Sequence, residues 1–380
     1  MKKTLLSTSA ILAAFGIAAG AQASNLQVNV GGYIDFQAGH VSDDIVGEGA
    51  NVQNETEFNT DSEIHFVVEG VADNGLEYGA VIELEADVDG QDGYDSGANA
   101  DKAYIYLQGG WGRVELGENT DAAEALSVNT SNFASATGGV DGDWYRYAGL
   151  AGGETFIIKP DLHLAHSGNA TNLNGGETAN EDATKVTYYS PRFSGFQVGL
   201  SYVPNTGDAS PTLFNGQGVT DNEDLFAAGI NYTGQFDEVG LAAAITGVTG
   251  DDKTVGGTAD IEGWDAGINV TFSGFTIGGS YGDWQDTLGT TTDANYFDIG
   301  LGYASGPWSI SATYLESEID RAGATNDDDF DNFVIGADYQ LAPGLVPYAE
   351  VSFFDMDADN AVSTQDNEGT VIMLGTQLTF

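Results

Sequence analysis

Hydrophobic and polar residues alternate along most of the chain after residue 26. The clearest case is segment 264–272, in which apolar side chains at even positions alternate with Asp265, Gly267, Asn269 and Thr271. The same alternation recurs in 64–68, 78–84, 275–281, 297–303 and 333–339. A period of two places successive side chains on opposite faces of a β-strand. The pattern therefore predicts strands with one apolar and one polar face.

The connections between these segments alternate in length. Short connections rich in turn-forming residues lie within 72–75, 109–112, 191–195, 234–237, 273–274, 305–307 and 343–344. Longer, polar connections lie between them, such as 41–59, 204–222, 250–260 and 357–368. Short turns at one end and long loops at the other are typical of an up-and-down barrel in an outer membrane.

Sixteen strands fit this rhythm, and an even number permits antiparallel closure between the first and last strands. They are expected to begin near Leu26, Asp61, Leu76, Asp101, Gly112, Ala183, Gly195, Glu223, Phe236, Ile261, Phe275, Asp293, Trp308, Asp328, Leu345 and Gly369. A water-soluble sandwich or jelly roll is the alternative, but aromatic residues gather at strand ends and the hairpins are too many for one sandwich. The prediction is an all-β, 16-stranded antiparallel transmembrane β-barrel over residues 24–380.

Residues 118–182 interrupt the hairpin rhythm for longer than any other segment. A loop of this length in a regular architecture is usually functional or disordered. Its aromatic and aliphatic residues, among them Phe133, Trp144 and Ile158, need a surface to pack on. We expect this long third loop to fold into the lumen, with a short helix over 121–127 capped by Thr120. Packing over the mouth or against a neighbouring subunit is the alternative.

Residues 1–23 have the features of a cleaved signal peptide. Lys2 and Lys3 precede an uncharged, mostly apolar stretch, and an Ala-Gln-Ala sequence at 21–23 provides a cleavage site. The stretch is too short for a membrane-spanning helix, for which about 20 apolar residues are needed. The protein is therefore expected to be exported.

Negative charge dominates the composition. The chain carries 58 Asp and Glu against 10 Lys and Arg, a formal charge of −48. Loss of Lys2 and Lys3 with the leader would leave 8 basic and 58 acidic residues, a net charge of −50. Nucleic acid is not an expected partner, because polyanions bind to clustered Lys and Arg. The absence of cysteine excludes disulfides, thiolate metal sites and cysteine catalysis.

Three parts of the chain resemble the general porins of Gram-negative bacteria, in particular those of alphaproteobacteria such as the Rhodobacter group. They are the strand-turn-strand segment 185–202 (KVTYYSPRFSGFQVGLSY), the opening segment 30–36 (VGGYIDF) and the terminal Phe380. The resemblance implies a homotrimer of 16-stranded channels in the outer membrane, in which the third loop narrows each pore.

The candidate constriction combines this resemblance with the strand pattern. The loop side is assigned to Asp121, Glu124, Asp141 and Asp143, and the basic wall to Lys102, Arg113 and Lys185, with Arg146 as a possible addition from the loop. Further acids facing the lumen include Glu63, Glu83, Glu85 and Glu115. Acidic rings favour cations. The predicted function is passive diffusion of ions and small hydrophilic solutes, with a preference for cations.

Two other functions are alternatives to the general pore. A substrate-specific channel, for example for a sugar, would use lumen aromatics such as Tyr33, Tyr104, Tyr106 and Tyr189, although these do not form an obvious series. An enzyme is disfavoured because the four histidines, His40, His65, His163 and His166, lack a complete set of metal ligands or a catalytic partner.

Clustered carboxylates in the loops raise the question of bound Ca²⁺. Asp327, Asp328 and Asp329 lie together in the acidic segment 326–331, and a second acidic segment covers 355–359. Carboxylate oxygens suit Ca²⁺ and Mg²⁺, but neither spacing matches an EF-hand. Such loops are expected either to contact the phosphates of lipopolysaccharide through divalent ions or to keep the outer surface hydrated. No other cofactor is expected.

Overall fold

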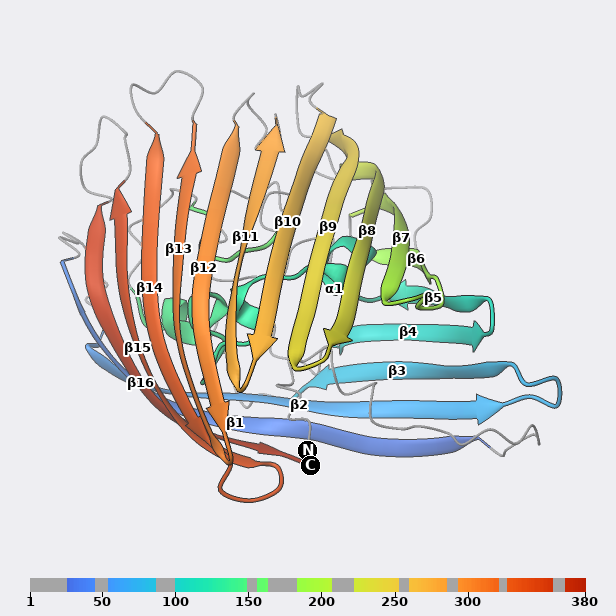
Figure 1. The fold of residues 1–380 in the computed structure, drawn as a ribbon, viewed down its shortest axis with the longest axis horizontal. Helices are drawn as coiled ribbons and strands as arrows, with labels where there is room; N and C mark the ends of the chain where they lie inside the picture. The colour runs from blue at the N-terminus through green and yellow to red at the C-terminus, as the bar shows by residue number, and fades with distance from the viewer. Residues whose placement is uncertain are drawn as a thin grey trace.

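The chain forms a closed barrel of sixteen antiparallel strands (Figure 1). The computed structural model describes residues 26–44, 54–86, 100–148, 156–162, 183–206, 222–252, 260–285, 293–320, 327–357 and 366–380. The strands are β1 (Gln27–Asp43), β2 (Thr56–Val71), β3 (Glu77–Glu85), β4 (Ala100–Gly109), β5 (Gly112–Glu118), β6 (Thr184–Tyr189), β7 (Phe196–Asn205), β8 (Asn222–Phe236), β9 (Val239–Asp252), β10 (Asp260–Phe272), β11 (Phe275–Gln285), β12 (Ala294–Ser305), β13 (Trp308–Ile319), β14 (Asp328–Tyr339), β15 (Leu345–Asp357) and β16 (Asn367–Thr379).

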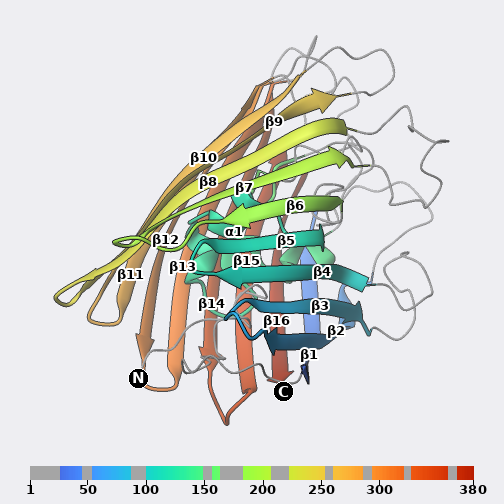
Figure 2. The ribbon, with the colours of Figure 1, turned by 90° about the vertical axis from the view of Figure 1, so that its right-hand side faces the viewer.

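Each strand pairs with its neighbours in the sequence, and the first pairs with the last (Figure 2). The β1–β16 register runs from Tyr33 opposite Thr379 to Asp43 opposite Gly369. Beyond it, the amide of Phe380 donates to the carbonyl oxygen of Gly32. Closure leaves the sheet without an edge of unpaired backbone groups. The predicted all-β, 16-stranded antiparallel barrel is confirmed.

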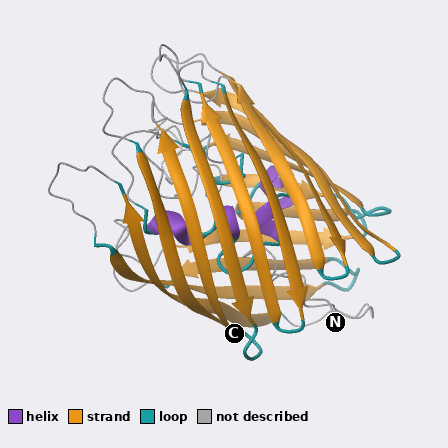
Figure 3. Ribbon diagram, turned by 60° about the vertical axis from the view of Figure 1, so that its left-hand side comes forward, coloured by secondary structure: helices purple, strands orange, loops and turns teal. Residues whose placement is uncertain are grey.

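The seven short turns predicted from the sequence all join consecutive strands, and they gather at one end of the barrel (Figure 3). The β10–β11 turn consists of Ser273 and Gly274 alone, with φ of 51° and 87°. Two consecutive residues with positive φ form the turn whose twist matches that of a two-stranded hairpin.

The two faces of the sheet differ sharply in polarity. On β12, Phe297, Ile299 and Leu301 are exposed, whereas Asp298 between them is fully buried. The same contrast runs along the other strands, so the outer surface is an apolar band and the inward side chains are largely polar. This inverts the pattern of a soluble sandwich, whose apolar faces meet inside. The outer band is therefore a lipid-facing surface of a transmembrane barrel.

Aromatic pairs mark the rim of this band near the short turns. The ring centroids of Phe275 and Tyr303 are 4.4 Å apart, and those of Trp308 and Tyr339 are 4.5 Å apart. Aromatic girdles of this kind lie at the membrane–water interfaces of such barrels. Among the residues that the structure describes, no helix is long and apolar enough to cross a membrane.

The strand boundaries differ from the predicted ones by a few residues. The largest difference is in β2, which begins at Thr56 instead of Asp61 because its first residues pair with β1 as far as His40. The predicted short helix exists as α1 (Ala122–Leu126), but its cap is Asp121 and not Thr120. The Asp121 carboxylate accepts from the amides of Ala123 and Glu124, and this satisfies two free donors of the first turn.

The depth of a residue in the outer band sets the cost of a charge there. Ile299 is exposed near the middle of β12. The variant Ile299→Arg should therefore lower the free energy of unfolding by about 2–4 kcal/mol. Leu341→Arg, beyond the end of β14 in a short turn, should cost no more than about 1 kcal/mol. Urea unfolding of the protein in lipid bilayers measures both, and equal losses would contradict the assigned membrane position.

Candidate functional site

Basic residues on the inner face lie on adjacent strands, and each contacts an acid or a carbonyl oxygen. Lys102 on β4 lies 3.3 Å from both Glu83 and Asp101. Arg113 on β5 lies 2.5 Å from Glu115 and stacks over the ring of Tyr106. These contacts hold two of the predicted basic-wall residues flat against the barrel. They also neutralise much of their charge locally.

Lys185 on β6 connects this wall to the segment that follows β5. Its ammonium group donates to the carbonyl oxygen of Asn119, and the Asn119 side chain donates to Glu115. Lys185 is 3% exposed, so it is a buried group beside the first residue of the third loop after β5. The three predicted basic residues therefore lie on the consecutive strands β4, β5 and β6, but at different levels, since Arg113 is opposite Gln108 and Lys185 is opposite Gly117.

The predicted loop acids separate into two groups. Glu124 belongs to α1 and Asp121 is its N-cap, and α1 packs against β7, β8 and β9. Asp141 and Asp143 belong to two short 3₁₀ helices, η3 (Gly139–Asp141) and η4 (Asp143–Arg146). η3 contacts β13 and β14, and η4 contacts β16. The four acids thus lie near different parts of the wall.

Asp143 and Arg146 connect the loop to β1 and β2. The Gln37 side chain of β1 donates to Asp143, and Arg146 lies 3.5 Å from Asp143 and 3.3 Å from Asp61 of β2. Tyr147 is buried beside them and donates to Gln37. Burial and the nearby Asp143 carboxylate raise the pKa of Tyr147, so its hydroxyl keeps the proton that it donates.

Asp141 is paired with Lys159, which lies farther along the same loop, at 3.2 Å. Burial opposes the charge on Lys159, but the Asp141 carboxylate together with Tyr145 and Asp143 raises the pKa of the lysine above its ordinary value. Lys159 therefore remains charged at neutral pH. The pair ties segment 156–162 to the 3₁₀ helices.

Buried wall carboxylates hold the backbone of the loop. Asp298 accepts from the amide of Thr130 at 2.9 Å, and Glu350 accepts from the amide and hydroxyl of Thr137. Both acids are at most 1% exposed. Their role is structural, because they satisfy hydrogen-bond donors of the loop.

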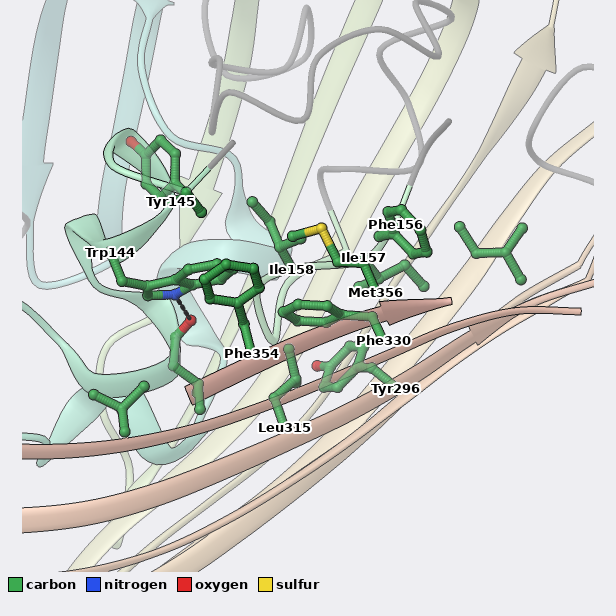
Figure 4. Close-up of a cluster of buried hydrophobic side chains, with 14 of the residues drawn as sticks. Trp144, Tyr145, Phe156, Ile157, Ile158, Tyr296, Leu315, Phe330, Phe354 and Met356 are labelled. Carbon is green, nitrogen blue, oxygen red and sulfur yellow. Dashed lines mark hydrogen bonds between the residues drawn. The ribbon is translucent and has the colours of Figure 1, made fainter. Parts of the chain in front are cut away.

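An aromatic stack holds η4 against strands β14 and β15 (Figure 4). The Trp144 ring packs 5.6 Å, centroid to centroid, from both Phe330 of β14 and Phe354 of β15. Its indole nitrogen donates to the Val140 carbonyl oxygen at 3.3 Å. Trp144 is fully buried, and Phe156 and Ile158 join the same cluster. The packing surface that these loop residues require is therefore the inner face of β12 to β16.

Glycines on the strands allow the backbone of the third loop to approach the barrel wall closely. A Cβ at Gly267 of β10 would lie 1.6 Å from the Val128 carbonyl oxygen, and one at Gly336 of β14 would lie 2.4 Å from that of Ser135. Sequence reasoning missed these residues as contact sites. Their signal was present, because both are glycines at inward positions of otherwise regular strands.

Neighbouring polar side chains linked by hydrogen bonds, ion pairs or strand pairing cross β1 to β4. The Tyr33 hydroxyl donates to Asp61 and Glu63, and Glu63 lies 2.6 Å from His65. His65 is directly opposite Glu83, which reaches Lys102. We call these six residues the charged wall. Of the other predicted acids, Glu85 lies at the end of β3, opposite Glu63.

The predicted Ca²⁺ ligands do not share one site. Asp328 is 1% exposed, whereas Asp329 is exposed, because consecutive residues of β14 point to opposite faces. Asp327 precedes the strand. His163 and His166 lie outside the described residues.

A closed transmembrane barrel with a polar, charged interior is the architecture of an outer-membrane channel. The chain belongs to the Gram-negative porin family, whose model matches residues 8–359. The Rhodobacter-type porin resemblance is thereby confirmed. The family and fold are those of non-enzymatic channels, so this protein is a channel and not an enzyme.

Individual relatives are similar at a moderate level. A monosaccharide porin of Halomonas sp is 26% identical, with 94% of this chain and 96% of that protein covered. A porin of Rhodobacter capsulatus is 25% identical, with 66% and 84% covered. The solved anion-selective porin of Comamonas acidovorans has a TM-score of 0.65 and 18% identity, with 94% and 100% covered.

Trp144 should dominate the attachment of η4. Trp144→Ala removes a fully buried ring from between Phe330 and Phe354 and should cost about 3–5 kcal/mol of unfolding free energy. It should also expose segment 119–148 to chymotrypsin. Trp111→Ala, at an exposed position in the β4–β5 turn, is the matched control and should do neither. Unchanged proteolysis in Trp144→Ala would contradict the anchoring role.

Proposed function

We propose that this outer-membrane porin mediates passive diffusion of ions and small hydrophilic solutes, with a preference for cations. The observation that carries this proposal is the charge balance of the inner face. Among the described residues, the buried acids are Asp35, Glu63, Glu83, Glu115, Asp121, Asp265, Asp298, Asp328 and Glu350, against the buried lysines Lys102 and Lys185. Lys102 is also ion-paired with acids. The remaining negative charge lowers the energy of a cation in the passage.

The third loop is the proposed constriction of this channel. Residues 119–148 contact inward-facing side chains from β1 to β15, among them Gln37, Ser201 and Ser311. A segment held on these side chains of a closed barrel occupies part of its cross-section. Asp121, Glu124, Asp141 and Asp143 then form the loop side, and Lys102, Arg113 and Lys185 lie on the wall.

The compartment and assembly follow from the same proposal. Residues 1–23 would direct export and be removed after Ala23, and residues 24–380 would form a homotrimer in the outer membrane. The outer face of β1 to β5 supports a protein contact, because it exposes mainly aliphatic residues such as Val30, Ile82, Ile105 and Leu107. Exposed aromatics concentrate on β7 to β15, where the barrel would face lipid.

A substrate-specific sugar channel is the second candidate, and the name of the Halomonas relative favours it. Tyr33, Tyr104 and Tyr106 are buried on the inner wall. Against it, the Tyr33 hydroxyl is engaged by acids and the Tyr106 ring by Arg113. In planar bilayers, a sugar that blocks the current with a saturable dependence would favour the specific channel over the general pore.

Neutralising the two acids at α1, Asp121 and Glu124, tests the proposed cation preference. Asp121→Asn/Glu124→Gln keeps a capping side chain, since Asn caps as well as Asp. One unit charge at about 7 Å in water contributes roughly 0.6 kcal/mol, so the cation-to-anion permeability ratio should fall about threefold or more. Reversal potentials under a salt gradient measure it.

The control for this variant is Asp237→Asn/Glu238→Gln, which removes the same charge from an exposed turn at the other end of β8. Its reversal potential should match the wild type. Anion preference of the wild-type channel would overturn the proposed selectivity.

Divalent ions and lipopolysaccharide are proposed partners of the outer face above the apolar band. Acids lie directly opposite one another across four strands there: Glu316 faces Asp331, Asp331 faces Asp355, and Asp355 faces Glu368. Like charges in opposing positions destabilise a sheet. Ca²⁺ bridges to lipid phosphates would relieve this repulsion.

The Ca²⁺ proposal predicts a conditional gain in stability. With EDTA present, Asp355→Asn should raise the free energy of unfolding by about 0.2–1 kcal/mol for each of the two like-charge pairs that it removes, with Asp331 and with Glu368. Excess Ca²⁺ should abolish this gain. Asp73→Asn, in an exposed short turn at the opposite end, should show no dependence on Ca²⁺. A gain that persists in Ca²⁺ would argue against the bridging ions.

A further inference from the structure

Three inward side chains of the charged wall form a compact group. Glu63 and His65 occupy alternate positions of β2, and Glu83 of β3 pairs directly opposite His65. One ligand atom from each, two carboxylate oxygens and an imidazole nitrogen, all lie within 4.8 Å of one another. All three residues are buried, and His65 is only 2% exposed. Among the described residues this is the one group with such geometry.

The donor set selects a particular class of ion. Zinc binds imidazole nitrogen and carboxylate oxygen, and open zinc sites use three protein ligands with water in the fourth position. Imidazole also suits Cu²⁺ and Ni²⁺, whereas Ca²⁺ and Mg²⁺ prefer oxygen ligands alone. A histidine between two glutamates therefore favours a transition-metal dication. The acidic rows on the outer face contain no such nitrogen.

Neighbouring groups hold the three ligands in place. The Tyr33 hydroxyl donates to Oε1 of Glu63 at 3.0 Å, which leaves Oε2 directed at Nε2 of His65 at 2.6 Å. The edge of one ring meets the face of the other between Tyr33 and His65, with centroids 6.3 Å apart. Hydrogen bonds behind the ligands orient them and raise metal affinity in known sites. The ligands are thus positioned by the wall itself.

The local charge also favours a dication. Glu63, Glu83 and Asp101 supply three negative charges, and Lys102 supplies one positive charge. With a neutral imidazole the group carries a net charge of −2, which one divalent ion balances. Lys102 lies 3.3 Å from Asp101 as well as from Glu83, so it retains a partner when Glu83 turns to a metal.

We propose that Glu63, His65 and Glu83 form a zinc-class metal site on the inner wall of the barrel, and that its occupancy reduces cation flux. The ion takes the place of the proton between Nε2 of His65 and Oε2 of Glu63. If His65 is protonated, this proton passes to water; if it is neutral, its proton moves to Nδ1, so His65 binds the ion as a neutral imidazole in both cases. The added positive charge then opposes cations in the passage. This second part rests on the proposed channel function, whereas the metal site does not.

The test is zinc binding to the folded protein in detergent, measured by calorimetry, with circular dichroism as the check on folding. The wild type should bind one zinc ion per chain, and His65→Asn should weaken binding at least tenfold, since even the loss of an orienting group costs about 10–100-fold. His40→Asn is the matched control, because His40 is exposed on β1 and contacts only Thr56 among the side-chain partners described for it. It should bind zinc as the wild type does.

Two further variants separate a metal site from a purely structural ion-pair network. Tyr33→Phe keeps the ring and removes the hydroxyl that orients Glu63, so zinc affinity should fall about tenfold. Lys102→Met removes a like charge next to the ion, so zinc should bind more tightly. A structural network alone would give no change in zinc affinity in either variant, and this result would overturn the proposal.

Conductance provides the second readout. Micromolar-range zinc should reduce the single-channel current of the wild type and of His40→Asn, but not of His65→Asn. A wild type that binds no zinc, or a His65→Asn variant that binds it equally well, overturns the metal site. Binding that depends on His65 without any effect on current leaves the metal site in place and overturns its effect on flux.

Discussion

Complete pairing of backbone hydrogen-bonding groups is the constraint on which this structure depends. In a lipid bilayer an unpaired amide or carbonyl has no water to bind, so a sheet survives there only if it closes. The β1–β16 pairing meets this requirement, from Tyr33 opposite Thr379 onward, and Phe380 extends it to Gly32. Every other feature follows from closure, because closure divides the side chains into an outer and an inner set.

The inner set must then satisfy many polar groups without a packed apolar core. The barrel does so by using wall acids as acceptors for the third loop: Asp298 binds the Thr130 amide and Glu350 binds Thr137. The apolar residues of the loop need their own contact, and the Trp144 stack on Phe330 and Phe354 supplies it. Polar and aromatic anchors together hold the loop, and they remove several acids from contact with water.

The large negative charge of the chain therefore has several different roles. Some acids are structural acceptors, such as Asp298, and some neutralise wall bases, such as Glu115 beside Arg113. Others form the opposing rows on the outer face, where Asp331 faces Asp355. The negative charge that is left without such a role is smaller than the composition indicates.

The sequence by itself determined the number of strands, their order, the short turns and the face on which each side chain lies. Alternation and turn chemistry are local properties, and each is set by neighbours within a few residues. Only the tertiary structure decided the partners: that Asp121 caps α1, that Glu350 holds Thr137, and that His65 meets Glu83. Such contacts depend on strand register and on where a long loop lies, and these are fixed by pairing between residues far apart in the chain.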